Sequence, residues 1–382
     1  MFRLSTLVKV STLVVGFLFS LGAFAAASES THEIRIGQIV SLTGPAAPFG
    51  IPERDTVTYQ VKQANENGGI HGYKVVHFVE DDESNPTVAA RVARKLILEK
   101  KVDVIIGPTT GTMSFAVGPI AARYKIPFLA PQGTVTVTNE DTGFYDWIFR
   151  VSVTDKITVV DAVNYMKNKN YKRVGLFFQE DAYGKSAAKI FKDLADQSDS
   201  IDIVAETSSQ LSTSNMSVQV TRLLAANPDV IFVQSDSVSA GAAILRALYE
   251  KSATVPVMVS GGMAMQAFVD AAGQAAEGVV AIGSIGWDKP NAEQASFIAG
   301  YGQPKGFSEA LAGTGFLAVK EATKSIEGNI TGSKLRDALE TICPFPTLIG
   351  GDGCYSASDH DGGLHGVNLK VVDGQWVTIS GQ

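Results

Sequence analysis

The chain has little cysteine and no excess of positive charge. Its 382 residues include two cysteines, so no third or fourth thiol is present to complete a zinc site. Lysine and arginine number 32 against 39 aspartate and glutamate residues, which gives a formal net charge of -7. A protein that binds nucleic acid or an anionic membrane needs a positive field. The composition therefore argues against both classes.

Short motifs of catalysis and metal binding are also missing. The sequence has no Gly-x-Ser-x-Gly elbow, no Walker A loop and no His-Glu-x-x-His pair. The acidic run at 80–83 lacks the spacing of a calcium-binding EF-hand loop. His360 and His365 lie in a glycine-rich stretch without a fourth placed ligand. We therefore expect no metal, no cofactor and no enzymatic activity.

One long apolar run occurs, and it lies near the start of the chain. Residues 13–27 follow the basic Arg3 and Lys9 and end in an Ala-x-Ala site at 25–27 or two residues earlier. This is the pattern of a cleaved secretory signal peptide, and it is shorter than the roughly 20 apolar residues that span a bilayer. No cysteine follows it for lipid attachment. We expect residues 1–27 to be removed and the mature protein to be exported without membrane insertion.

Cys343 and Cys354 are expected to form a disulfide, because exported proteins meet oxidants. The two residues are eleven positions apart, and closing so short a loop would contribute about 3 kcal/mol. Two free buried thiols are the alternative.

After the apolar run, short β-branched segments alternate with amphipathic segments of helical length. This alternation is typical of parallel sheets, and several segments are apolar throughout, as in strands buried on both faces. Strands are expected at 34–40, 73–79, 102–106, 126–130, 174–178, 201–205, 230–234, 255–259 and 279–282, and a hairpin at 366–379 turning at Asp373 and Gly374. Helices are expected after the Asn85 cap and at 154–167, 182–196, 215–225, 239–250 and 308–326.

The mature chain of roughly 355 residues exceeds the size at which one core keeps growing, so two lobes are expected. We predict an α/β fold of two doubly wound lobes. The N-terminal lobe comprises 33–151 with 285–362, and the C-terminal lobe comprises 152–284 with 363–382. Hinges are expected near Arg150 and at 283–286. Such an arrangement suits a clamp that closes on a ligand.

A series of short motifs then points to a family. They are IG at 36–37, LTGP at 42–45, FG at 49–50, NGGIHG at 67–72, EDD at 80–82, VIIGP at 104–108, IP at 126–127, WIFR at 147–150, YG at 183–184, NPD at 227–229 and AEG at 276–278. In this order the chain resembles periplasmic solute-binding proteins of the branched-chain amino acid type. The resemblance implies a type I periplasmic binding protein, with two lobes joined by three crossovers and a ligand in the cleft. It also implies a monomer in the periplasm that delivers its solute to the permease subunits of an ABC importer.

Ligands of open α/β sheets bind beyond the carboxyl ends of the strands. The segment Thr110, Gly111 and Thr112 follows a strand and opens a helix, so it offers amides and hydroxyls to a carboxylate, although a simple helix cap is the alternative. Relatives commonly have Ser where this chain has Gly111. The resemblance assigns polar contacts to Gln132, through its backbone carbonyl, and to Thr134. It also implies that the aromatic ring of Phe49 covers the ligand.

From the C-terminal lobe, the resemblance assigns Tyr183 as a lid. Amino-acid-binding relatives typically place an acidic residue where this chain has Gly261, and that acid pairs with the ligand's ammonium group. An ammonium removed from water needs such a partner. Either Asp236 takes over this role, or the ligand has no ammonium group. Asp236 could instead cap the helix that follows it.

Three functions therefore stay open. The first is the extracytoplasmic receptor of an ABC importer that captures a branched-chain or other apolar amino acid. The alternatives are a receptor for an aromatic or 2-oxo carboxylic acid without an amino group, and a ligand sensor of the same fold.

Overall fold

A computed structural model describes residues 2, 32–210, 213 and 215–379. Apart from Phe2, the predicted signal peptide lies outside the described residues. From His32 onward the described residues belong to one compact unit. Within the described part, no helix has both the length and the apolar character needed to span a bilayer.

The N-terminal lobe is built on a parallel sheet that has five strands in the described part of the chain. Its order is β2-β1-β3-β4-β5, and Ile36 of β1 lies between His77 of β2 and Val104 of β3. The apolar runs form these strands because both faces are covered by helices. The strands are β1 (Glu33–Val40), β2 (Lys74–Asp81), β3 (Val104–Ile106), β4 (Phe128–Ala130) and β5 (Ile148–Arg150).

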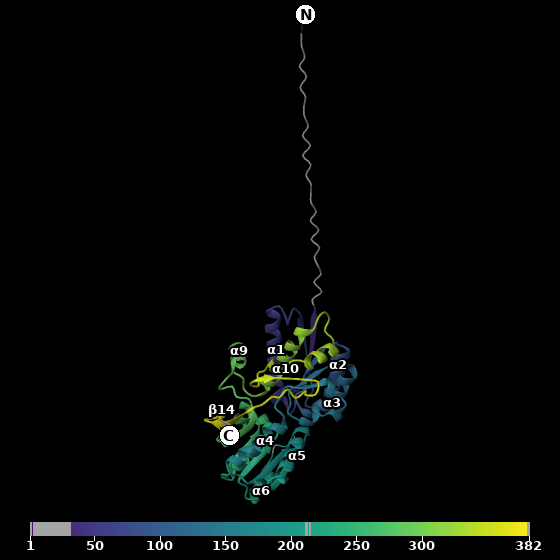
Figure 1. Cartoon of the computed structure of the whole chain (residues 1–382). Coiled ribbons are helices and arrows are strands. Elements are labelled where there is room, and N and C mark those ends of the chain that lie inside the picture. Colours follow the sequence, from purple (N-terminus) through teal and green to yellow (C-terminus); the bar gives the residue numbers. More distant parts are fainter. Residues whose placement is uncertain (1, 3–31, 211–212, 214, 380–382) are drawn as a thin grey trace. The chain divides into compact units, whose positions relative to one another are not determined.

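Helices α1 (Ala47–Glu66), α10 (Ser308–Ala322) and α11 (Gly332–Leu339) pack in one hydrophobic cluster against this sheet. Helices α2 (Pro86–Leu98) and α3 (Gly111–Tyr124) pack in a second cluster, and Figure 1 shows the two groups on opposite sides. The first lobe is therefore doubly wound.

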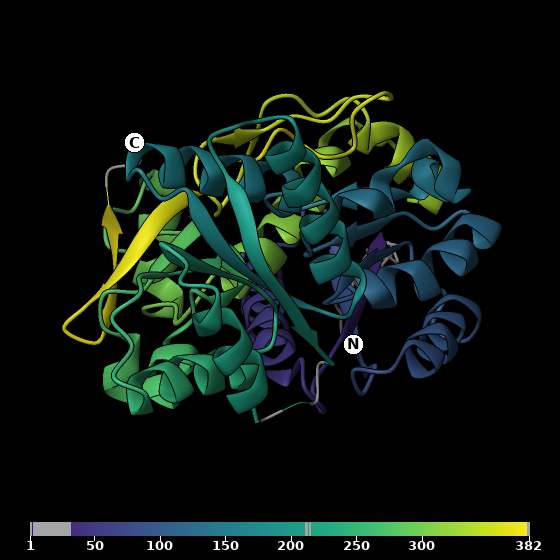
Figure 2. The same ribbon diagram turned by 90° about the horizontal axis from the view of Figure 1, so that it is seen from below.

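The C-terminal lobe has a sheet of seven described strands in the order β14-β13-β10-β9-β8-β6-β7. Five are parallel, and the antiparallel hairpin of β13 and β14 completes one edge (Figure 2). Its turn at Asp373 and Gly374 has positive φ at both residues, as predicted. The strands are β6 (Arg173–Gln179), β7 (Asp202–Ser209), β8 (Val230–Gln234), β9 (Val257–Ser260), β10 (Val280–Ser284), β13 (Val367–Val372) and β14 (Gln375–Ile379).

Helices cover both faces of this second sheet as well. One face carries α4 (Asp155–Asn168) and α5 (Ala182–Asp196), and the other carries α6 (Ser217–Ala225), α7 (Val238–Glu250) and α8 (Gln266–Ala272). The described chain passes between the lobes after β5, after β10 on the way to α9 (Ala292–Tyr301), and before β13. The predicted fold class, two doubly wound lobes joined by three crossovers, is confirmed. The exact lobe boundaries stay a prediction.

Two elements near the cleft were not predicted. Helix α1 contains Gly50 and Pro52, residues that ordinarily weaken a helix interior, whereas Pro48 lies in its first turn, where proline is tolerated. Packing against α10 overrides this tendency, and a Cβ atom at Gly50 would collide with the backbone of Ser41, which explains the glycine. Strand β5 was not among the predicted strands either, although its residues belong to the WIFR motif at 147–150.

Cys343 and Cys354 are joined by a disulfide in the structure. The loop that they close contains the two-stranded pair β11 (Phe345–Pro346) and β12 (Asp352–Gly353). This loop belongs to the N-terminal lobe and does not reach the cleft described next.

Candidate ligand-binding cleft

A cleft of about 630 Å³, its open mouth included, lies between the two lobes. Eight of the nine predicted ligand-binding residues line it, namely Phe49, Thr110, Gly111, Gln132, Thr134, Tyr183, Asp236 and Gly261. Thr112 is not in the lining, and its hydroxyl oxygen accepts a hydrogen bond of 3.4 Å from the backbone N–H of Ala182 in the other lobe.

The amino end of α3 forms part of the cleft wall. Thr110 caps this helix, since its hydroxyl oxygen accepts a 3.5 Å hydrogen bond from the N–H of Met113. Thr110 and Gly111 both line the cleft, so the first turn of the helix presents its partial positive charge there. Thr110 therefore serves as a cap and as a wall of the cleft.

The loop after β4 places two unpaired donor groups in the same wall. Gln132 and Thr134 are 5 % and 0 % exposed, and neither the Nε2 of Gln132 nor the hydroxyl of Thr134 has a hydrogen-bond partner. Gln132 Oε1 accepts the backbone N–H of Thr134 at 2.7 Å, which directs the amide nitrogen away from the loop. Buried unpaired donors are costly, and a bound acceptor would satisfy them.

Arg150 supports this loop from behind. Its guanidinium group is fully buried and donates to the carbonyl oxygens of Gln132 at 2.8 Å and Thr134 at 2.9 Å. It also donates to the hydroxyl of Thr138 at 2.7 Å and to Asp361 Oδ1 at 2.8 Å. The backbone carbonyl of Gln132, which the resemblance assigned to the ligand, therefore already accepts a bond from Arg150. Sequence reasoning identified Arg150 as a hinge position and missed this supporting role.

Gly111 is explained by the same loop. A Cβ atom at this position would collide with the side chain of Thr134. The serine that relatives commonly carry here has no room, because the Thr134 hydroxyl occupies its place.

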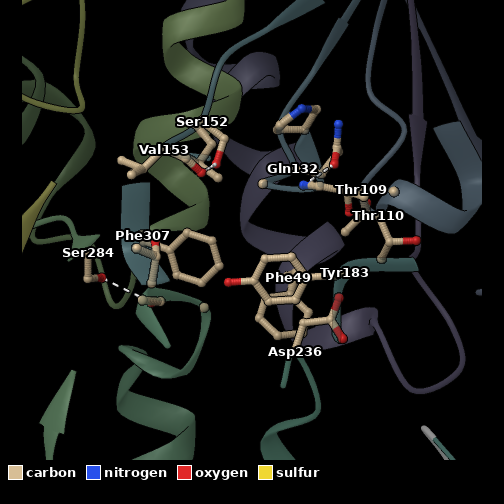
Figure 3. Close-up of a pocket in the computed structure, with 18 of the residues that line it drawn as sticks. Phe49, Thr109, Thr110, Gln132, Ser152, Val153, Tyr183, Asp236, Ser284 and Phe307 are labelled. Carbon is tan, nitrogen blue, oxygen red and sulfur yellow. Dashed lines mark hydrogen bonds between the residues drawn. The ribbon is translucent and has the colours of Figure 1, made fainter. Parts of the chain in front are cut away.

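In the C-terminal lobe, Asp236 and Asp181 share one donor. Gln179 Nε2 donates to Asp236 Oδ1 at 2.7 Å and to Asp181 Oδ2 at 2.7 Å. Burial, and then the charge of Asp181, raise the pKa of Asp236 well above its usual range. Helix α7 is capped by Ser237, whose hydroxyl accepts the N–H of Ala240 at 3.2 Å. The carboxyl group of Asp236 is therefore not the cap and faces the cleft (Figure 3).

Gly261 has no room for a side chain. A Cβ atom there would lie 2.5 Å from the carbonyl oxygen of Gly283 and 2.8 Å from its carbon. Because these are backbone atoms, the acidic residue that relatives carry at this position would require the end of β10 to move. This chain cannot hold a carboxylate there in the present backbone.

Aromatic and aliphatic side chains form the rest of the cleft. The rings of Phe49 and Phe307 are 5.8 Å apart, and Figure 3 shows both with Tyr183 around the same space. Leu311 and Val153 extend this apolar surface. Sequence reasoning missed Phe307, which precedes α10 and follows no strand of the N-terminal sheet.

The charge of the lining is one-sided. Among the described residues that line the cleft there is no Lys, Arg or His, whereas Glu53 and Asp236 are both present. Glu53 is 1 % exposed, and burial raises its pKa well above the usual range, opposed by a hydrogen bond from Thr109. Glu53 was not predicted, because it projects from a helix that the sequence did not reveal. Among described residues no cluster of His, Cys, Asp or Glu is arranged to hold a metal ion.

Comparison with known proteins agrees with this architecture. The model of a family described as periplasmic binding protein matches residues 33–374. The chain belongs to the periplasmic binding protein family. A Leu/Ile/Val-binding protein, BraC3, of Rhizobium johnstonii is 26 % identical over 268 residues, which cover 69 % of this chain and 71 % of that protein. The resemblance seen in the sequence is confirmed, and the family and this relative are binding proteins rather than enzymes.

Two solved structures extend the comparison. An extracellular ligand-binding receptor from Rhodopseudomonas palustris HaA2 has a TM-score of 0.83 at 25 % identity and covers 91 % of this chain and 99 % of its own. A solute-binding protein of an ABC transporter from Rhodopseudomonas palustris BisB5, in complex with 3,4-dihydroxy benzoic acid, has a TM-score of 0.81 at 24 % identity and covers 91 % and 96 %. The second likeness establishes the shared fold alone.

Proposed function

We propose that this protein is the periplasmic receptor of an ABC importer and that it captures an apolar amino acid by closing its two lobes. The observation that carries the proposal is the charge of the cleft. Its described lining contains Asp236, whose carboxyl group can pair with an ammonium group, and no basic side chain that would pair with a plain anion.

The solute's carboxylate would lie against the N-terminal lobe. The first turn of α3 at Thr110 and Gly111, the Thr134 hydroxyl and the Gln132 amide supply donors without a full positive charge. A carboxylate can be held by such groups when several converge on it. The Thr134 hydroxyl and the Gln132 amide nitrogen have no hydrogen-bond partner in the structure, which supports this placement of the carboxylate.

The solute's ammonium group would pair with Asp236. This carboxyl group is partly buried, and it shares the Gln179 donor with Asp181. A bound cation lowers the cost of ionising Asp236. Because Gly261 admits no side chain, Asp236 takes over the role that another acid has in relatives.

The apolar side chain of the solute would occupy the space between Phe49, Phe307 and Leu311. Tyr183 lies against Gly133 of the opposite lobe, with its Cε2 atom 3.1 Å from where a Cβ would stand. This contact supports a lid role for Tyr183 across the closed cleft. The closed receptor would act as a monomer and dock on the permease subunits.

A receptor for an aromatic or 2-oxo acid is the second candidate, favoured by the aromatic walls and by the absent acid at Gly261. A ligand sensor would use the same cleft and differ only in its partner.

The experiment compares L-leucine with 4-methyl-2-oxopentanoate, which has the same carboxylate and apolar side chain but a ketone oxygen in place of the ammonium group and the α-hydrogen. Isothermal titration calorimetry and thermal shift should show tighter binding of leucine. Asp236→Asn should weaken leucine binding by about 100-fold, since it leaves a buried charge unpaired, and should leave the oxo acid unaffected. Asp270→Asn, an exposed acid of the same lobe, is the control. Tighter binding of the oxo acid by the wild type would reject the amino acid in favour of the second candidate.

A further inference from the structure

Glu53 is a buried acid in the wall where the solute's carboxylate is expected. It lies on α1 one turn after Phe49 and lines the cleft together with Thr109 and Thr110. An ionised carboxylate here would repel the carboxylate of the solute, and no basic residue of the described lining compensates. The contacts proposed for the solute do not explain why an acid occupies position 53.

The hydrogen bonds of Thr109 distinguish the two oxygens of Glu53. The Thr109 hydroxyl oxygen accepts the backbone N–H of Ser41 at 3.1 Å, and the hydroxyl donates to Glu53 Oε2 at 2.7 Å. Oε2 is therefore an acceptor within the protein. Because Oε2 is bonded to Thr109, a proton on Oε1 would be available to a group in the cleft.

The charged groups around Glu53 oppose its ionisation. Asp82, in the turn after β2, and Glu309, in the first turn of α10, are both buried and raise the pKa of Glu53, although burial is the larger cause. The charge of Lys305 lowers the pKa of Glu309, whose Oε1 accepts the Lys305 backbone N–H at 2.9 Å. The environment therefore favours the neutral acid.

We propose that Glu53 binds the solute as an un-ionised carboxylic acid and donates its proton in a hydrogen bond to the solute's carboxylate. Glu53 is then a specificity-determining residue, which adds a strong neutral donor to the Thr134 hydroxyl and the Gln132 amide. The inference rests on the proposed function only in requiring a solute with a carboxylate. It holds for an amino acid and for an oxo acid alike.

The test uses Glu53→Gln, which keeps a donor and an acceptor, and Glu53→Leu, which keeps neither. Asp55→Asn, an exposed acid on the same helix, is the control. Calorimetry with L-leucine and with 4-methyl-2-oxopentanoate should give affinities for Glu53→Gln within about threefold of wild type. Glu53→Leu should lose about 10- to 100-fold with both solutes, the range for one hydrogen bond to a charged group.

The pH dependence of binding supplies a second readout. Wild-type affinity for 4-methyl-2-oxopentanoate, which has no ammonium group to titrate, should fall at the alkaline end, as Glu53 loses its proton, and Glu53→Gln should not show this fall. Equal losses of affinity in Glu53→Gln and Glu53→Leu, or an unchanged alkaline fall of affinity in Glu53→Gln, would overturn the inference and leave the proposed function intact. If the wild type bound neither solute, the proposed function would fail and the inference with it. Should Glu53→Leu fail to fold, the pH profiles of wild type and Glu53→Gln decide.

Discussion

Replacing Asp155 with asparagine should stabilise the unliganded protein at neutral pH. Asp155 begins α4 just after the first crossover and is fully buried. Its Oδ1 accepts the backbone N–H of Val135 at 3.1 Å, and Ser186 and the charge of Arg150 oppose the effect of burial on its pKa. Asparagine keeps the acceptor for Val135 and removes a charge that the interior disfavours.

The size of the effect follows from the pKa of Asp155, which burial raises from 3.8 to about 6. Between these values the folded state binds a proton that the unfolded state has released, so this group's contribution to stability increases as pH falls through 6 toward 4. At pH 7 the ionised group costs about 3 kcal/mol, from a shift of roughly two units at about 1.36 kcal/mol each. At pH 4.5 the cost is about 1 kcal/mol.

Urea and thermal unfolding of wild type and Asp155→Asn at pH 7 and 4.5 would measure this difference. The variant should exceed wild type by up to about 3 kcal/mol at pH 7, and the gap should shrink by about 2 kcal/mol at pH 4.5. Asp196→Asn, an exposed acid of the same lobe, should show no gap that changes with pH. A gap independent of pH, or a variant less stable than wild type at pH 7, would refute the reasoning.

Two further variants probe the shape of the cleft. Gly261→Ala should lower the free energy of unfolding by about 1–3 kcal/mol, because its Cβ meets the Gly283 backbone. At Gly262 a Cβ would have 3.6 Å to its nearest neighbour, so Gly262→Ala should keep the stability of wild type in the same unfolding experiment. Arg150→Lys should weaken solute binding by at least about tenfold, because one ammonium cannot replace the guanidinium's separate bonds to the loop carbonyls. Unchanged affinity in Arg150→Lys would show that the loop holds its geometry without the guanidinium.

The architecture was predictable because its strands are buried on both faces. The run at 230–234 is apolar at four positions and coincides with β8, and the turn at Asp373 and Gly374 was recognised from residues that tolerate positive φ. The site residues that follow strands, such as Thr110 and Asp236, were predicted from the rule that ligands bind at carboxyl ends of strands. Local pattern and topology sufficed for these features.

Other features depend on contacts between distant segments. Glu53 reaches the cleft from α1, a helix that was not predicted from the sequence because it contains two prolines. The raised pKa of Glu53 depends in part on Asp82 and Glu309, which are far away in the chain. Arg150 was visible only as a boundary, since its partners include Asp361 more than two hundred positions later. Periodicity in the sequence contains no information about such pairings.

A receptor that holds its solute with neutral donors and ionisable acids has a consequence for release. With no basic side chain in the described lining, the empty cleft has no fixed positive charge that would retain an anion. Burial and Asp181 favour the neutral form of Asp236, whereas an incoming ammonium favours its anion. Under the proposed function, capture would therefore release a proton from Asp236, and opening of the lobes would rehydrate both partners and cancel the attraction. The same acid would then support tight binding in the closed state and weak retention in the open one.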